Sequence, residues 1–147
     1  MRTHLAIGMA LALLFLPNIN EKILFIPIIL IASILPDLDS GFSNVGKNFI
    51  FKPVQMVSAH RGIFHSLTIC IIAAILLSFA YPPMSFPFFL GYSFHLLADS
   101  FTPNGIKPFW PLKTKVEGRI TTGGKIEDVI LIVLLVLDGI LLISIFI

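Results

Sequence analysis

The sequence predicts an all-α protein: a polytopic membrane bundle of about five membrane-embedded helices, forming a single domain over residues 1–147. Two observations predict this fold class. The chain is 56% hydrophobic and 12% charged, with a mean hydropathy of +0.98. A soluble domain of this size lacks the polar surface to cover so many apolar side chains, whereas the hydrocarbon of a bilayer removes the need for such cover. The apolar residues also gather in a few long stretches, each of which predicts one helix.

The stretches differ in their ability to cross a membrane. The third and the fifth are long enough to cross a hydrocarbon core of about 30 Å. The first two are short, and Pro27 interrupts the second, so we expect them to tilt, to thin the bilayer or to lie partly inside the protein. Between the third and the fourth, residues 82–85 (Pro-Pro-Met-Ser) are expected to form a tight turn. The five stretches are residues 5–16, 23–35, 63–81, 86–101 and 129–147.

The basic residues predict the orientation of this bundle. Nine of the ten Lys and Arg residues fall on one side of a five-segment arrangement, and Lys22 alone lies on the other. Because cytoplasmic loops are enriched in Lys and Arg, we expect a multi-pass protein of the inner membrane with a cytoplasmic N-terminus and its C-terminus outside. The formal charge of +2 is too small to indicate a nucleic-acid partner.

The histidines and several aspartates lie where apolar stretches begin or end. Alternate ends of a membrane bundle face the same side of the bilayer, and all of these ends fall on the side that the basic residues mark as cytoplasmic. Imidazoles and carboxylates gathered in this way indicate a metal site at the membrane surface. The expected ligands are His4, Asp37, Asp39, His60, His65, His95 and Asp99.

The spacing within two of these motifs indicates how the ligands are presented. His95 and Asp99 are four residues apart, so on a helix they project from one face and can bind one cation; a buried hydrogen-bonded pair is the alternative. Pro36 closes the second stretch, and in an extended continuation Asp37 and Asp39 point the same way. A divalent cation would relieve the repulsion between their carboxylates, and a plain helix-ending turn is the alternative.

The remaining polar positions are less uniform. His60 and His65 are about 140° apart on an ideal helix, so we expect His60 to precede the third helix and His65 to lie in its first turns. Arg61 between them suits a phosphate oxygen or serves only as a topogenic charge. Glu127 opens the last helix, either within the site or simply as an acidic residue favoured at a helix N-terminus. Asp138 lies about 16 Å further along that helix and is expected to be structural, protonated or hydrogen-bonded to Ser78, Thr68 or Tyr92.

Six segments, taken in order, carry a family resemblance: Thr3-His4, residues 35–39 (LPDLD), 60–66 (HRGIFHS), 91–99 (GYSFHLLAD), 102–105 (TPNG) and Trp110-Pro111. Together they resemble the bacterial and archaeal family of inner-membrane-associated metal-dependent hydrolases, also described as LexA-binding. The resemblance extends from residue 3 to about residue 130. It implies a hydrolase in which the seven expected ligands and Glu127 match the family's polar positions. Ser40 and Phe64 depart from the family, whose members often carry histidine and threonine there.

The ligand order is also similar to that of zinc-dependent phospholipase C, as an analogy of spacing. We therefore expect a phosphoesterase-like hydrolase with a divalent metal, zinc first and manganese or iron as alternatives. The metal would supply hydroxide, Asp39 or Glu127 would accept a proton, and Arg61 would neutralise a phosphate oxyanion. The expected substrate is a phospholipid or another lipid-linked phosphoester of the bilayer. The alternative is a non-catalytic metal-binding or regulatory membrane protein that docks a cytosolic partner such as LexA.

Overall fold

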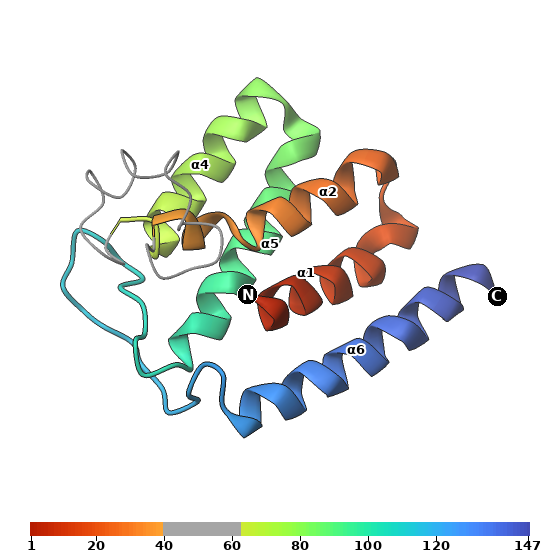
Figure 1. The fold of residues 1–147 in the computed structure, drawn as a ribbon. Helices are drawn as coiled ribbons and strands as arrows, with labels where there is room; N and C mark the ends of the chain where they lie inside the picture. Colours follow the sequence, from red (N-terminus) through yellow and green to blue (C-terminus); the bar gives the residue numbers. More distant parts are fainter. Residues whose placement is uncertain (40–62) are drawn as a thin grey trace.

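The computed structural model describes residues 1–39 and 63–147, which form an all-helical bundle (Figure 1). Expectations that concern residues 40–62, including those for His60 and Arg61, lie outside the described residues. Two short 3₁₀ helices, η1 (Leu16–Asn18) and η2 (Leu35–Asp39), follow the first two α-helices. The α-helices are α1 (Arg2–Phe15), α2 (Lys22–Ala32), α4 (Leu67–Ala80), α5 (Pro82–Ser100) and α6 (Lys125–Phe146).

Helix α5 lies at the centre of the bundle, where it packs against α1, α2 and α4. Helix α6 lies beside α1 at the edge, and the two run in the same direction (Figure 1). As a result, α1 and α6 begin at the end of the bundle where α2 leads into η2, α4 begins and α5 finishes. This end collects the polar side chains that terminate the apolar helices.

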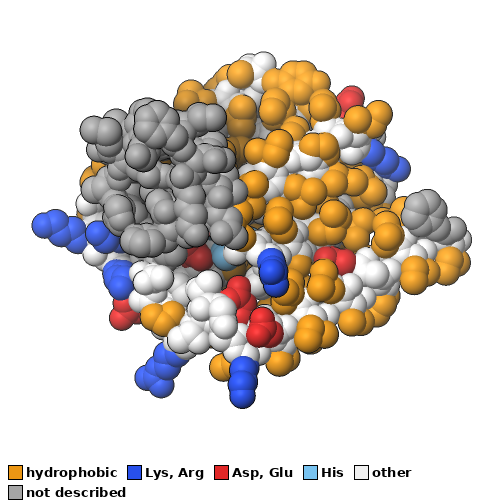
Figure 2. Space-filling view, viewed as in Figure 1, with side chains coloured by type: hydrophobic (Ala, Val, Ile, Leu, Met, Phe, Trp, Pro, Cys, Tyr) orange, Lys and Arg blue, Asp and Glu red, His pale blue; other side chains and the backbone are white. Residues whose placement is uncertain are grey.

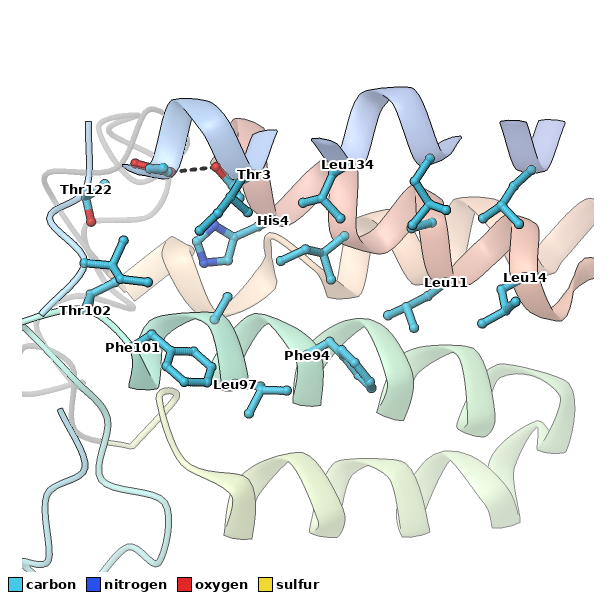
Figure 3. A pocket seen from close by; sticks show the side chains of 18 residues that line it. Thr3, His4, Leu11, Leu14, Phe94, Leu97, Phe101, Thr102, Thr122 and Leu134 are labelled. Atoms are coloured by element: carbon cyan, nitrogen blue, oxygen red, sulfur yellow. Dashed lines mark hydrogen bonds between the residues drawn. The ribbon is translucent and has the colours of Figure 1, made fainter. Parts of the chain in front are cut away.

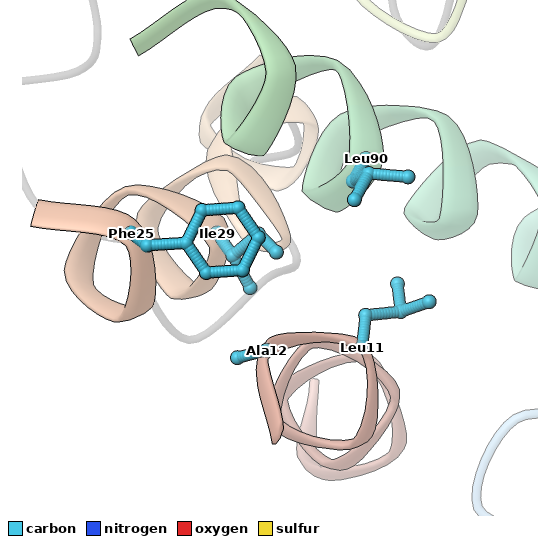
Figure 4. Close-up of a cluster of buried hydrophobic side chains, with 5 residues drawn as sticks. All are labelled: Leu11, Ala12, Phe25, Ile29 and Leu90. Atoms are coloured by element: carbon cyan, nitrogen blue, oxygen red, sulfur yellow. The ribbon is translucent and has the colours of Figure 1, made fainter. Parts of the chain in front are cut away.

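The first core cluster joins α1, α2 and α5 (Figure 4). Ala12 and Ile29 are fully buried in it. These side chains lie on the faces that the three helices turn toward one another, so burying them sets how the helices pack. The cluster consists of Leu11, Ala12, Phe25, Ile29 and Leu90.

Capping chemistry changes two of the expected helix boundaries. Ser66 caps α4, because its hydroxyl oxygen accepts a hydrogen bond from the Thr68 amide at 3.1 Å. The helix therefore begins at Leu67 and has 14 residues, and the prediction that residues 63–81 form a helix long enough to cross the bilayer is wrong. Residues 82–85 are not a separate turn either. Pro82 begins α5 directly, because the first turn of a helix does not need the amide that proline lacks.

Within the described residues, α6 is the one helix both long and apolar enough to span a membrane, over Lys125–Ile145. Its outward side chains, such as Ile132, Val133 and Val136, are about 60% exposed. Hydrophobic side chains also cover much of the visible face over α1 and α2, whereas Lys and Arg side chains gather mainly around the end where α6 begins (Figure 2). The bundle is thus apolar outside as well as inside, and its polar groups concentrate at one end.

Gly91 allows α5 to approach α2 closely, and this contact yields a stability prediction. A Cβ at position 91 would overlap the Ile29 carbonyl oxygen and come within 2.9 Å of the Ala32 Cβ. We expect Gly91→Ala to lower the free energy of unfolding by about 1–3 kcal/mol, measured by thermal unfolding in detergent. Gly139→Ala in α6 is the matched control: a Cβ there meets no atom within 4 Å, so it should be neutral or stabilising. Equal effects of the two substitutions would contradict the close packing of α2 and α5.

Candidate metal centre

Five of the seven expected ligands lie together at the polar end of the bundle. They come from four different segments: α1, η2, the turn before α4, and α5. All five side chains are buried, none more than 9% exposed. Groups of this kind are rarely buried unless they are paired or bind a metal ion. The five are His4, Asp37, His65, His95 and Asp99.

The carboxylate of Asp99 is surrounded by three imidazoles. Its Oδ1 lies 3.1 Å from His4 Nε2, and its Oδ2 lies 3.3 Å from His65 Nε2. The His4 and His95 rings are 4.2 Å apart between centroids. The imidazoles thus crowd around a single carboxylate, although their segments are distant in the sequence.

The orientation of His95 is set by the backbone of α2. Its Nδ1 lies 2.7 Å from the carbonyl oxygen of Ser33, and a carbonyl only accepts hydrogen bonds, so Nδ1 must carry the proton. In the neutral ring, Nε2 then presents a lone pair. This Nε2 lies 3.7 Å from Asp99 Oδ2, too far for a hydrogen bond, and it is buried without a hydrogen-bond partner among the described residues. Metal-binding histidines have this arrangement, with one ring nitrogen held by a carbonyl and the other free for the ion.

Two triads in this cluster have the geometry of metal sites, and both include His95. One is His4, His95 and Asp99, and the other is Asp37, His65 and His95; within each, the potential ligand atoms lie within 4.8 Å of one another. Three atoms that are 4.8 Å apart lie about 2.8 Å from their common centre, whereas zinc ligands lie about 2.1 Å from the ion. The triads therefore need adjustments of less than about 1 Å to hold an ion. The donor set of imidazoles and carboxylates suits zinc, manganese or iron.

Burial also perturbs the acidity of Asp37. Removal from water raises the pKa of this carboxyl, and the positive charge that His4 can carry acts in the opposite direction. A divalent cation in the second triad would stabilise the ionised form and reverse the effect of burial. Metal binding at Asp37 would require the ionised carboxylate.

Glu127 lies at the edge of the cluster, outside both triads. Its Oε1 accepts a hydrogen bond from the Thr3 hydroxyl at 2.7 Å, and its Oε2 accepts one from the Gly123 amide. Because Thr3 adjoins His4, this carboxylate connects the start of α6 to the start of α1. Its expected role as an acidic group at a helix N-terminus is compatible with this position.

Two details of the sequence prediction are wrong. Residues 36–39 belong to the 3₁₀ helix η2 and are not an extended chain, so there is no basis for expecting the Asp37 and Asp39 side chains to point the same way. The Asp39 side chain lies outside the described residues. His65 lies in a turn before α4 and not in its first turns, because Ser66 is the cap.

Asp138 is expected to have a structural role and to be either protonated or hydrogen-bonded, and the structure tests only the hydrogen bonds to the three named side chains. Its expected partners Ser78, Thr68 and Tyr92 all donate their hydroxyl hydrogens to backbone carbonyls. Asp138 Oδ1 is buried and has no hydrogen-bond partner in the part of the chain that the structure describes.

Sequence reasoning missed the groups that position the ligands. The Tyr92 hydroxyl donates to the Phe64 carbonyl at 2.5 Å, and the Ser66 hydroxyl donates to the Pro108 carbonyl at 3.2 Å. Together these bonds hold the turn that carries His65. Tyr92 lies three residues before His95, so it shares that helical face. The three-residue spacing between Tyr92 and His95 is visible in the sequence and is enough to place Tyr92 beside the site.

The fold and the site define a class: an all-α protein with a helix able to span a membrane and a buried histidine–aspartate cluster at one end. The chain belongs to the family of YdjM inner membrane proteins, which it matches over residues 1–145. This membership supports a location in the inner membrane.

Among its relatives, inner membrane protein YdjM of Escherichia coli (strain K12) is 31% identical over 98 residues, which cover 60% of this chain and 50% of that protein. The Shigella flexneri YdjM matches equally. The chain thus spans about half the length of these two relatives. The uncharacterized protein YvsG of Bacillus subtilis (strain 168) is 30% identical over 118 residues, covering 73% of this chain and 74% of YvsG. No solved structure matches.

The bond between Thr3 and Glu127 yields a prediction for the contact of α1 with α6. We expect Thr3→Val to destabilise the protein by about 1–2 kcal/mol, because it removes a hydrogen bond to a charged acceptor. Thr3→Ser, which keeps the hydroxyl, should be near wild type. Thermal unfolding of both variants, alone and combined with Glu127→Gln, gives the coupling between the two residues. If Thr3→Val and Thr3→Ser unfold alike, the hydrogen bond does not contribute to stability.

Proposed function

We propose that this protein is a hydrolase of the inner membrane that uses one or more divalent cations, zinc first, and acts on a phospholipid or another phosphoester. The observation that carries the proposal is His95, whose Nδ1 is held by the Ser33 carbonyl and whose buried Nε2 faces the carboxylate and imidazoles of the cluster. Apolar packing alone does not need such a cluster. A buried group of this kind, arranged for metal binding, is typical of a functional site.

In this proposal His4, Asp37, His65, His95 and Asp99 hold the metal. When bound, the metal supplies hydroxide at neutral pH and polarises a phosphoryl oxygen. The buried walls exclude bulk water, which strengthens electrostatic interactions inside the site. Asp99 lies between two of the imidazoles, with its Oδ1 3.1 Å from His4 Nε2 and its Oδ2 3.3 Å from His65 Nε2.

Glu127 is the proposed proton acceptor among the described residues, because its carboxylate adjoins Thr3 and His4 at the edge of the cluster. The expected roles of Asp39 as a further ligand or base, of His60 as a ligand, and of Arg61 on a phosphate oxyanion remain part of the proposal. Their side chains lie outside the described residues.

A multi-pass arrangement with the N-terminus inside and the C-terminus outside is also part of the proposal. The Thr3–Glu127 bond supports it, since α1 and α6 then begin at the same end of the bundle. Reporter fusions at residue 147 and within residues 102–126 should report opposite sides of the membrane. The same side for both would show that α6 does not cross.

The decisive variants change a proposed ligand or the deep carboxylate. We expect His95→Ala and Asp99→Ala to lower metal affinity and turnover by about 100-fold or more, since each removes a proposed ligand. Asp138→Asn should keep the metal affinity and the turnover of the wild type, because Asp138 lies about 16 Å of helical rise beyond Glu127. Metal content per chain is measured by elemental analysis of the purified variants, and turnover with chromogenic phosphoesters and phospholipids.

The pattern of results separates the alternatives. Metal bound by the wild type without turnover would favour the non-catalytic role, in which the protein docks a cytosolic partner such as LexA. A metal-free Asp138→Asn beside a metal-bound Asp99→Ala would contradict the site altogether.

A further inference from the structure

An elongated apolar groove opens beside the metal centre, between α1, α5 and α6 (Figure 3). Its volume is about 610 Å³. Leucine, isoleucine and phenylalanine side chains of the three helices line most of it, among them Leu11, Phe94, Leu97 and Leu134. The groove is open on one side, so a ligand can enter it laterally.

Among the described residues, the polar side chains that line the groove lie at one of its ends. Thr3, His4, Thr102, Thr122 and Glu127 line that end, and Leu14 lies toward the other (Figure 3). His4 belongs both to this wall and to the triad with His95 and Asp99. A ligand that fills the groove therefore has an apolar part along the helices and a polar part beside the proposed metal ligands.

The length of the groove matches one leaflet of a bilayer. Along α1 it runs from His4 to Leu14, which is about 15 Å of helical rise. The hydrocarbon core of a bilayer is about 30 Å thick, so each leaflet contributes about 15 Å. The groove wall on α6 also belongs to the helix that is long and apolar enough to span the membrane.

The distribution of polar groups favours an amphiphile over a helix of a second copy. A hydrocarbon chain that carries one polar head group matches a groove that is lined by apolar side chains along the helices and by polar side chains at one end.

We propose that this groove binds a hydrocarbon chain of a bilayer phospholipid and presents its ester-linked head group to the metal centre. Binding of the hydrocarbon chain is inferred from the groove alone, whereas the role of the head group as substrate rests on the proposed hydrolase function. The class of substrate is then a phospholipid of the same leaflet, which reaches the site without leaving the membrane.

The test uses the full-length protein in phosphatidylglycerol nanodiscs that contain a phospholipid with a photoreactive diazirine in one acyl chain. Leu11 is the diagnostic position, because it lines the groove and is only 8% exposed, so bulk lipid does not reach it. After illumination, mass spectrometry of peptides should locate adducts at Leu11. We expect Leu134→Trp, which fills the groove, to reduce this labelling about tenfold.

Leu135→Trp is the matched control. Leu135 neighbours Leu134 on α6 but is 56% exposed and does not line the groove, so labelling at Leu11 should stay at the wild-type level. Ala10→Phe fills the groove from α1 and should act as Leu134→Trp does, which separates occlusion from misfolding of one variant. The comparison is made between variants whose unfolding temperatures match that of the wild type.

The outcomes separate this proposal from the proposed function. Labelling at Leu11 that the groove-filling variants remove supports chain binding, and it should persist in the His95→Ala variant even if no hydrolysis is measured. Turnover of phosphoesters without labelling at Leu11 would contradict the proposal that the groove binds a hydrocarbon chain, while the proposed hydrolase function would still hold. An equal loss of Leu11 labelling in Leu135→Trp would also contradict chain binding in the groove. Cross-links between two protein chains through the groove would contradict it too, and would indicate that a second copy of the chain occupies the groove.

Discussion

The structure depends on how a buried carboxylate is satisfied. An ionised side chain removed from water is stable only where hydrogen bonds or opposite charges replace its hydration. Asp99 meets this condition because His4 and His65 approach its two oxygens from different segments. Helices α1 and α5 and the turn before α4 therefore have to meet at this point. The first core cluster holds α1, α2 and α5 together further along the bundle.

Burying so many polar groups at one place does little for stability, since apolar side chains of similar size often pack at least as well. Their presence is better explained by the chemistry that they make possible. The rest of the bundle is accordingly simple: short apolar helices around α5, with α6 attached along α1. Because the polar cluster is confined to one end of the bundle, the groove beside α6 lies along the apolar helices and leaves the cluster intact.

The helical character of the apolar stretches and the shared face of His95 and Asp99 could be predicted from the sequence, because both follow from hydropathy and helical periodicity. The sequence did not reveal the true start of α4 or the course of residues 35–39, which depend on the cap at Ser66 and on local backbone geometry. Nor did it reveal the bonds from Thr3 to Glu127 and from His95 to Ser33. These pairs are separated by 124 and 62 residues, and local sequence patterns do not predict contacts over such distances.

The acceptor that orients His95 is a backbone oxygen, and every amino acid carries one. The side chain at position 33 matters for packing against Gly8 but not for the identity of the acceptor. What places the carbonyl is the path of the chain where α2 leads into η2. An insertion or deletion of a single residue between Ala32 and Asp37 would still leave a backbone carbonyl at the end of α2 but would shift Asp37 relative to it. The position at which α2 ends, more than the identity of residue 33, therefore determines the direction in which the imidazole of His95 points.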